Sequence, residues 1–236
     1  MSTRYFVLQK PVDGSIADDS KNTILVTPPM VNHILPLNNL SYYSSHGLFE
    51  KGLIDWCKQF GGSEKVLLDI GAHSGTYGLS LAPYFKRVHA FEPQKMTFYA
   101  LCGGVALSGF KNVECHNIGL GEESQVGVQE LNIVSNDGGG SSIHATGQAV
   151  LAKESIRIQT LDSLGLDSIG FIKMDVEENE LSVLKGGVET LKRCGYPKIL
   201  FESNKQNPPL FSFVQSLGYS ITSVTGAGNM FLAYRD

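Results

Sequence analysis

The sequence predicts an α/β fold built on a mostly parallel sheet, because short apolar runs alternate with helical patterns through most of the chain. Two of these runs, KVLLDI (65–70) and IGFIKMD (169–175), are almost wholly apolar, which is typical of central strands buried on both faces. The last two runs, YSITSV (219–224) and NMFLAYR (229–235), are separated only by a short glycine-containing turn. They therefore predict an antiparallel hairpin at the C-terminal edge of the sheet.

The other elements follow from the same patterns, taken in chain order. Helical periodicity and glycine stops predict helices over 47–60, 75–85, 94–109 and 210–218, and strands are expected over 87–92, 112–120 and 198–202. Between these elements, 124–134 and 155–161 alternate in hydropathy like antiparallel or exposed strands. The intervening SNDGGGSSIHATG (135–147) is rich in glycine and serine, which predicts an irregular loop.

The segment 176–195 is predicted to form one helix. Apolar residues recur at helical spacing, acidic residues in the first turn complement the helix dipole, and Gly195 provides the stop. The apolar stripe consists of Leu181, Leu184, Val188 and Leu191, and the acidic residues are Glu177, Glu178 and Glu180.

Residues 1–44 differ from the rest of the chain. They contain several prolines and asparagines and two strand-like runs, YFVLQ (5–9) and TILVT (23–27). We expect an N-terminal arm or small hairpin laid on a main domain of residues 45–236, and the alternative is a lid that faces the acceptor site.

Composition limits the classes of function. The 236 residues are 42% apolar, carry a net charge of -4 and show no basic run, which makes nucleic acid an unlikely main partner. The first residues lack the apolar core of a signal peptide, and no run is long enough to span a bilayer, so we expect a cytoplasmic protein without a membrane span. The four cysteines form no CxxC motif and are expected to be reduced thiols.

Acidic residues mark the ends of four predicted strands, where open parallel sheets bind their ligands. These residues are Asp69, Glu92, Asp175 and Glu202. Four acids would bind a pyrophosphate poorly. They suit a ligand that carries hydroxyl groups and a positive charge.

The segment GAHSGTYG (71–78) has the spacing G-x-x-x-G-x-x-G, whereas sites for NAD favour G-x-G-x-x-G. Glu92 follows Asp69 at the end of the second predicted strand, where an acid can accept both hydroxyls of a ribose. A ribose together with a cation indicates S-adenosylmethionine. The candidate cofactor contacts are Asp69, Gly71, Ala72, His73, Ser74, Gly75, Glu92, Asn117 and Asp175. The alternative is that the glycines only form a turn and that Asp69 caps a helix.

Four motifs together resemble the FkbM-type S-adenosylmethionine-dependent O-methyltransferases. They are VLLDIGAHSGTYGLSLA, VHAFEPQ, IKMDVEENELSVLKGG and KILFES, and the resemblance covers residues 64–220. It implies a class I methyltransferase Rossmann-like fold and methylation of hydroxyl groups, often on sugars or hydroxylated natural products. It also implies that the cofactor positions are Asp69, Gly71, His73, Gly75 and Glu92, and that Asp175, Glu177 and Glu180 form the acidic motif.

One position departs from the family. Glu178 stands where the family usually has glycine. We expect the backbone there to remain helical, so that the change adds a carboxylate near the site without disabling it.

Methylation of an alcohol needs a base, or a metal ion that acidifies the hydroxyl group. Asp175 is the first candidate, because it ends a central strand next to the cofactor crevice. Glu202 ends the neighbouring strand, and the two carboxylates, with His144 from the loop, could bind Mg²⁺ or Mn²⁺. Lys173 points the same way as Asp175 and could bind an acceptor. The alternatives are an ion-paired Lys173 and an exposed loop histidine at 144.

Three functions fit these residues. The first is an O-methyltransferase for a sugar or another hydroxylated small molecule, with an acceptor pocket built from 1–44 and 135–155. The second is an RNA ribose 2'-O-methyltransferase, which the acidic balance disfavours. The third is a non-catalytic cofactor-binding subunit, for which Glu178 is the only support. The sequence carries no signal for an oligomeric state.

Overall fold

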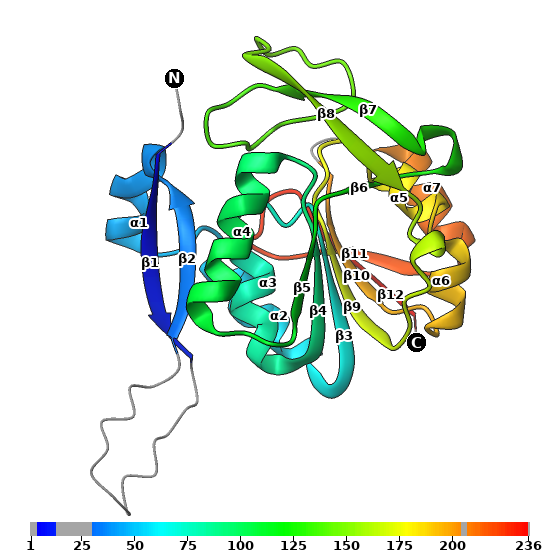
Figure 1. The fold of residues 1–236 in the computed structure, drawn as a ribbon. Coiled ribbons are helices and arrows are strands. Elements are labelled where there is room, and N and C mark those ends of the chain that lie inside the picture. The colour runs from blue at the N-terminus through cyan, green and yellow to red at the C-terminus, as the bar shows by residue number, and fades with distance from the viewer. Residues whose placement is uncertain (1–3, 13–29, 204–206, 236) are drawn as a thin grey trace, which may run out of the picture.

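The computed structural model describes residues 4–12, 30–203 and 207–235, and it confirms an α/β fold around a mostly parallel sheet (Figure 1). The seven-stranded sheet has the order β11-β12-β10-β9-β3-β4-β5. Its strands are β3 (Gly62–Ile70), β4 (Phe85–Phe91), β5 (Val113–His116), β9 (Ile169–Met174), β10 (Lys198–Glu202), β11 (Ser220–Ser223) and β12 (Met230–Tyr234). The first five of these are mutually parallel, so their carboxyl ends meet at one edge.

The predicted C-terminal hairpin is present, because β11 pairs with β12 in antiparallel register. The last strand is not at the edge, however. β12 lies between β10 and β11 and is antiparallel to both, which leaves β11 as the outer strand.

Helices cover both faces of the sheet and divide the core into two layers (Figure 1). Alternate residues of β3 show the division, since Leu67 packs with one layer and Leu68 with the other. The first layer contains α2 (Lys51–Cys57) and α3 (Thr76–Leu81), with α4 (Lys95–Ser108) beside them, and the second contains α5 (Glu180–Lys185), α6 (Val188–Arg193) and α7 (Pro208–Ser216).

The predicted helix over 176–195 is broken into α5 and α6 at Gly186 and Gly187. A Cβ atom at Gly186 would lie 2.0 Å from the carbonyl oxygen of Gly121, so the backbones approach too closely for any side chain. The acidic residues 177 and 178 also precede the helix instead of forming its first turn. The single-helix prediction is therefore wrong in both respects.

The N-terminal residues form an antiparallel hairpin of β1 (Tyr5–Pro11) and β2 (Met30–Pro36), followed by α1 (Leu40–His46). Asn32 fixes the hairpin to the end of α4, because its side-chain amide donates to the carbonyl of Leu107 at 3.0 Å. The run TILVT (23–27), predicted as a strand, lies outside the described residues.

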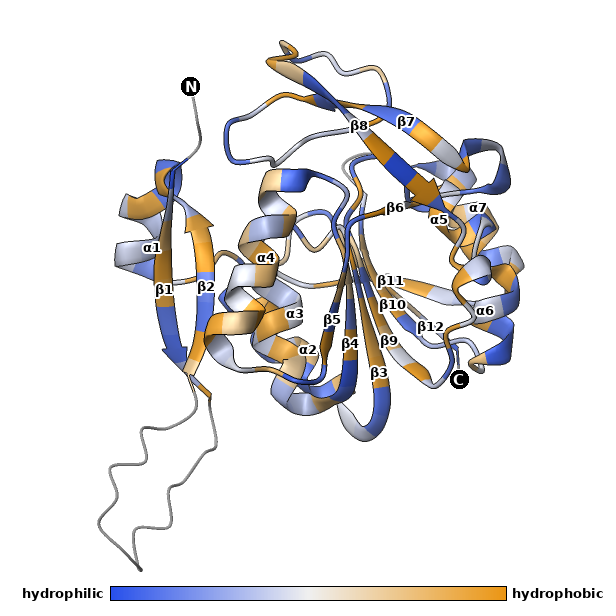
Figure 2. Cartoon of the chain, viewed as in Figure 1, coloured by the Kyte–Doolittle hydropathy of each residue, from blue (hydrophilic) through white to orange (hydrophobic). Residues whose placement is uncertain are grey.

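A separate three-stranded sheet, with the order β6-β8-β7, stands above the main sheet (Figure 1). It contains β6 (Gly119–Leu120), β7 (Gly127–Ile133) and β8 (Ala152–Gln159), and β7 pairs with β8 in the predicted antiparallel manner. Hydrophobic and hydrophilic residues alternate along β8 (Figure 2). The strand predicted over 112–120 is divided, since β5 joins the main sheet and β6 joins this one.

The remaining segments of regular structure are short 3-10 turns at Leu37–Asn39, Lys58–Phe60, Ala82–Tyr84, Glu123–Gln125 and Asp162–Leu164. The four cysteines are free thiols. Within the described ranges, no helix combines the length and the hydrophobicity needed to cross a membrane.

Candidate functional site

A cleft of about 310 Å³ lies at the carboxyl ends of β3, β4 and β9. Gly71, His73, Glu92 and Asp175 line it, so the structure brings together four of the residues predicted to bind the cofactor. The glycine-rich loop Asp137–Ser142 forms another wall. The side chains at this edge of the sheet therefore converge on one cavity, as the strand-end pattern predicted.

The turn between β3 and α3 is shaped by Gly71. Its φ of 75° is unfavourable for residues with a side chain, and a Cβ atom there would lie 1.8 Å from the carbonyl oxygen of Asp175. A hydrogen bond also joins the tips of β3 and β9 at this turn, because the Asp175 N–H donates to the carbonyl oxygen of Ile70 at 3.0 Å. Glycine is thus required for the two strand tips to meet.

Asp69 lies beneath this turn and does not line the cleft. Its side chain is fully buried, and Oδ2 accepts a hydrogen bond of 2.7 Å from the Gly78 N–H in α3. Burial raises the pKa of Asp69, although the nearby Lys173 opposes the shift. Asp69 therefore fixes the turn to the helix through Gly78, although the N-cap residue of α3 is Gly75 and not Asp69. The neighbouring Ala72, Ser74 and Gly75 also lie outside the cleft lining.

Glu92 is buried at the end of β4, and three donors hold its carboxylate. The backbone N–H groups of His73 and Gln94 each donate at 2.8 Å, and the Thr97 hydroxyl donates at 3.0 Å. Burial raises the pKa of Glu92, and these donors oppose that shift. Asn117 is bonded to the carbonyl of Glu92 at 2.9 Å and is exposed, so it supports this turn from outside the cleft.

Lys173 is buried below the cleft and faces several acids. Its Nζ lies 3.3 Å from the carbonyl oxygen of Gly71 and 3.5 Å from Asp175 Oδ2. Burial lowers the pKa of Lys173, but the charges of Asp175, Asp69 and Glu50 outweigh that effect and raise it. Lys173 therefore stays charged in an ion pair. The alternative to a role in binding an acceptor was an ion pair with Glu177 or Glu202, but the partner is Asp175.

Asp175 and Glu202 form a hydrogen-bonded pair of carboxyl groups at neighbouring strand tips. Burial, together with the charge of Asp175 and the hydrogen bond between them, raises the pKa of Glu202 to about 8. The pair therefore retains one proton near neutral pH, because two adjacent carboxylates cannot both ionise easily.

Glu202 of this pair also borders a second groove, of about 910 Å³. Glu202, Glu50 and Trp56 line it, with the tip of the β11–β12 hairpin, 222–230. Glu50 is held by the Tyr77 hydroxyl, which donates to it at 2.8 Å. Asp175 lines the first cleft and Glu202 lines the second, so the carboxyl pair contributes one residue to each cavity. Sequence patterns did not indicate this groove.

The glycine-rich loop is fastened across the first cleft. His73 Nε2 lies 2.6 Å from the carbonyl oxygen of Asp137, and the Gly140 N–H donates to Glu177 at 3.0 Å. His144 is exposed, and its Nε2 lies 3.0 Å from Asn179 Oδ1. The prediction that His144 joins the carboxyl pair is therefore wrong. Among the described residues, the three groups close enough to share a metal ion are instead His89, Glu114 and His116.

Glu178 has a left-handed backbone, with φ of 76°, and Glu177 beside it has φ of 52°. The expectation of a helical backbone at Glu178 is therefore wrong. Left-handed conformations cost residues with a side chain about 1–2 kcal/mol, which explains why glycine suits this position. Burial is the main cause that raises the pKa of Glu177 and of Glu180, and the charges of Asp175 and Glu178 add to it.

Comparisons with known proteins agree with this geometry. The family model described as methyltransferase FkbM domain matches residues 69–221. Among solved structures, a methyltransferase FkbM from Methylobacillus flagellatus is 21% identical, with a TM-score of 0.52, over 73% of this chain and 44% of its own. A candidate methyltransferase from Streptococcus mutans in complex with SAH is 13% identical, with a TM-score of 0.51, over 78% of this chain and 94% of its own.

The chain thus spans less than half the length of the Methylobacillus protein. A precorrin-6y C5,15-methyltransferase from Geobacter metallireducens shares the fold at a TM-score of 0.50 and 11% identity, over 80% of this chain and 90% of its own. At these identities the structural matches establish the class I methyltransferase fold. A search of curated protein sequences finds no match.

The strained backbone at Glu178 yields a stability prediction. We expect Glu178→Gly to raise the free energy of unfolding by about 1 kcal/mol, because glycine adopts the left-handed conformation without strain. Chemical denaturation measures the change. The matched control is Glu178→Ala, which removes the same charge but keeps the strain, and should gain less. Equal stability of the two variants would contradict the assignment of strain.

Proposed function

Because the chain belongs to the FkbM methyltransferase family, we propose that it methylates a hydroxyl oxygen of a sugar or similar small polyhydroxylated molecule, with S-adenosylmethionine as methyl donor. The observation that carries the proposal is the carboxyl pair of Asp175 and Glu202, which contributes one residue to the lining of each of two cavities. One cavity is available for the methyl donor and the other for the acceptor.

The first cleft suits S-adenosylmethionine. Gly71 and His73 line it at the turn after β3, and Glu92 lines it at the end of β4. We assign the ribose hydroxyls to Glu92 and the positively charged end to the side of Asp175. When bound, the cofactor supplies a methyl group activated by its sulfonium charge. The other residues predicted to contact the cofactor would act indirectly, by holding Gly71, His73 and Glu92 in place. They are Asp69, Ala72, Ser74, Gly75 and Asn117.

The acceptor hydroxyl must lose its proton as its oxygen bonds to the methyl carbon. Glu202 faces the acceptor groove, and its hydrogen bond to Asp175 lets the two carboxyl groups share the released proton. Lys173 holds Asp175 in position through their ion pair. We therefore assign the role of general base to the pair, with Lys173 as a positioning residue.

A Mg²⁺ or Mn²⁺ ion on Asp175 and Glu202 remains an alternative way to acidify the acceptor. The pair offers the carboxylate oxygens that these ions prefer. His144, the third ligand expected for such an ion, contacts Asn179 instead. We therefore favour acid–base catalysis by the pair.

The groove has the chemistry of a carbohydrate site. Trp56 provides an aromatic surface, and hydroxyl and amide groups come from Thr222, Ser223, Thr225 and Asn229. Its described lining contains Glu50 and Glu202 but no basic residue, which disfavours the phosphate backbone of RNA. The acceptor site we propose is thus this groove.

We assign the N-terminal residues 1–44 a supporting role as an arm on the catalytic domain, 45–236. Part of this arm also reaches the cofactor cleft, as a lid would, because Asn39 and Tyr43 line that cleft.

The substrate class is tested by a methyl-transfer screen with labelled S-adenosylmethionine against glycosides, other small alcohols and short RNAs, each with and without EDTA. We expect transfer to one or more glycosides that persists in EDTA. Transfer to RNA alone would replace the sugar assignment. Cofactor binding without transfer to any acceptor would favour a non-catalytic subunit.

The pH dependence of methyl transfer tests the carboxyl pair. Because its base form is deprotonated, we expect kcat/KM to rise with pH and level off above the Glu202 pKa of about 8. Glu202→Gln should lower kcat/KM about 100-fold or more, with unchanged cofactor affinity. The control is Glu123→Gln, at an exposed carboxylate outside both cavities. A Glu202→Gln enzyme with full activity and the same pH profile would exclude the pair as base.

The ribose assignment is tested at Glu92. We expect Glu92→Gln to weaken binding of S-adenosylhomocysteine at least about tenfold by isothermal titration calorimetry, because an amide NH₂ replaces a charged acceptor. Circular dichroism and the melting temperature establish that the variant is folded. Unchanged affinity in a folded variant would place the ribose elsewhere.

A further inference from the structure

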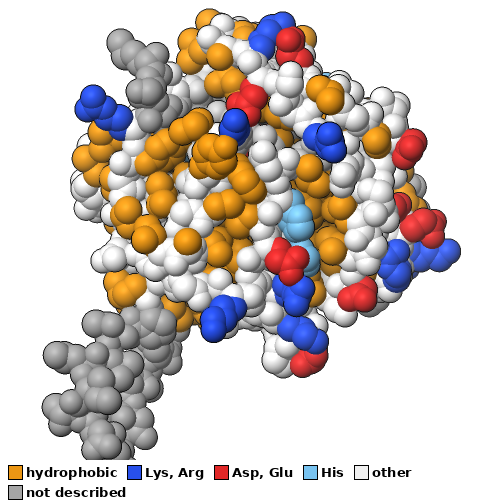
Figure 3. Space-filling model, in the orientation of Figure 1, with side chains coloured by type: hydrophobic (Ala, Val, Ile, Leu, Met, Phe, Trp, Pro, Cys, Tyr) orange, Lys and Arg blue, Asp and Glu red, His pale blue; other side chains and the backbone are white. Residues whose placement is uncertain are grey.

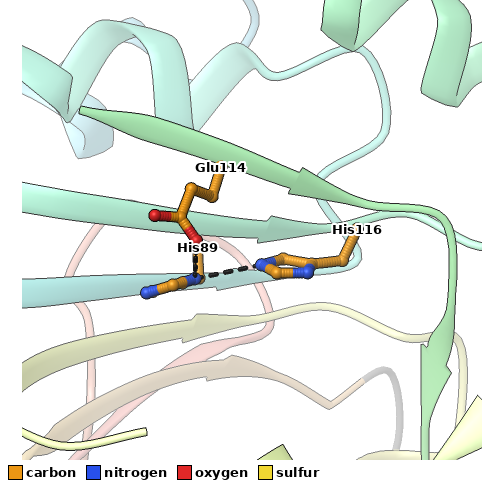
Figure 4. A group of neighbouring side chains, drawn as sticks. All are labelled: His89, Glu114 and His116. Atoms are coloured by element: carbon orange, nitrogen blue, oxygen red, sulfur yellow. Dashed lines mark hydrogen bonds and ion pairs between the residues drawn. The ribbon is translucent and has the colours of Figure 1, made fainter. Parts of the chain in front are cut away.

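The face of the sheet over β4 and β5 carries polar side chains that the methyl-transfer site does not use. β5 is followed by β6 and not by a helix, whereas α5, α6 and α7 cover the same face of the other strands. Figure 3 shows histidine side chains at the surface here, beside acidic and basic groups. They form a cluster of His89 on β4 with Glu114 and His116 on β5 (Figure 4).

The cluster has the spacing of a metal site. His89 Nδ1 lies 3.0 Å from His116 Nε2 and 3.5 Å from Glu114 Oε2, and the three ligand atoms all lie within 4.8 Å of one another. Ligands about 2.0–2.1 Å from a tetrahedral Zn²⁺ ion are about 3.3 Å apart. Two of the distances already match this geometry to within a few tenths of an ångström.

The side chains are held in place by the sheet. His89 pairs with Glu114 in the β4–β5 register, and Phe91 pairs with His116. The His116 ring stacks on Phe91 with centroids 4.6 Å apart and on His89 at 5.2 Å. The cluster therefore needs little rearrangement to receive an ion.

The carboxylate of the cluster is oriented by a further partner outside it. Arg87 pairs with Glu114 Oε1 at 2.5 Å, which leaves Oε2 directed at His89.

We propose that His89, Glu114 and His116 bind a divalent transition-metal ion, with Zn²⁺ as the best match, and that water completes the coordination. The proton now shared between the histidines moves to the outer nitrogen of one ring, so that both inner lone pairs face the ion. No net charge on the imidazoles changes in this step. The ligand set of two imidazoles and one carboxylate is that of zinc and not of Mg²⁺, which prefers oxygen.

The site would stabilise the β4–β5 edge and take no part in methyl transfer. Its link to the cofactor cleft runs through the backbone, because the carbonyl of His116 accepts from the Glu92 N–H at 3.0 Å. An ion joining β4 to β5 at this point would hold the strand end that positions Glu92.

The test is isothermal titration of the EDTA-treated, dialysed full chain with Zn²⁺, with Co²⁺ absorption as a report of coordination. We expect one site per chain with a tetrahedral Co²⁺ spectrum, and at least about 100-fold weaker Zn²⁺ binding in His116→Asn and in Glu114→Gln. Glu114 is half exposed, so its substitution leaves the fold intact even if that of His116 does not. The control is His46→Asn, at an exposed histidine on α1.

Equal Zn²⁺ affinity in wild type and both variants would overturn the proposal. So would loss of the site in His46→Asn, because the ion would then be bound adventitiously at the surface. Zn²⁺ binding that raises the melting temperature of wild type, but not of Glu114→Gln, would support the stabilising role. The result is independent of methyl transfer, so it stands or falls separately from the proposed function.

Discussion

The close contact between Gly71 and the carbonyl of Asp175 is the constraint on which the rest of the site depends. A Cβ atom on residue 71 would lie 1.8 Å from the carbonyl oxygen of Asp175, so only glycine allows the tips of β3 and β9 to meet. That meeting brings Gly71 and Asp175 together in the lining of the cleft. The glycine spacing in the sequence is therefore a consequence of strand packing as much as of ligand binding.

Charge balance beneath the contact is the second requirement. The charge of Asp175 acts on both Asp69 and Glu202, and burying carboxylates is costly unless they are paired or protonated. Lys173 supplies one positive charge in contact with Asp175 and Gly71. Protonation of Glu202 relieves the remaining excess of negative charge, and the raised pKa of Glu202 reflects this. That proton must leave before the pair can act as the proposed general base, so the same charge balance sets the expected pH dependence.

The sequence was sufficient where the signal is local. Apolar runs located the parallel strands, and acids at their ends predicted the edge where Gly71, Glu92 and Asp175 converge. It was insufficient where long-range contacts decide the outcome. The helix break at Gly186 depends on Gly121, and the groove depends on Trp56 meeting the β11–β12 tip. Likewise, His89, Glu114 and His116 become a cluster only through the register of β4 with β5.

The most direct test of the central claim is a crystal structure of this chain with S-adenosylhomocysteine. We predict the ligand in the cleft between Gly71 and Glu92, with its ribose hydroxyls within hydrogen-bond distance of the Glu92 carboxylate and its sulfur on the side of Asp175. A ligand bound outside this cleft, or one whose sulfur lies far from the carboxyl pair, would contradict the account.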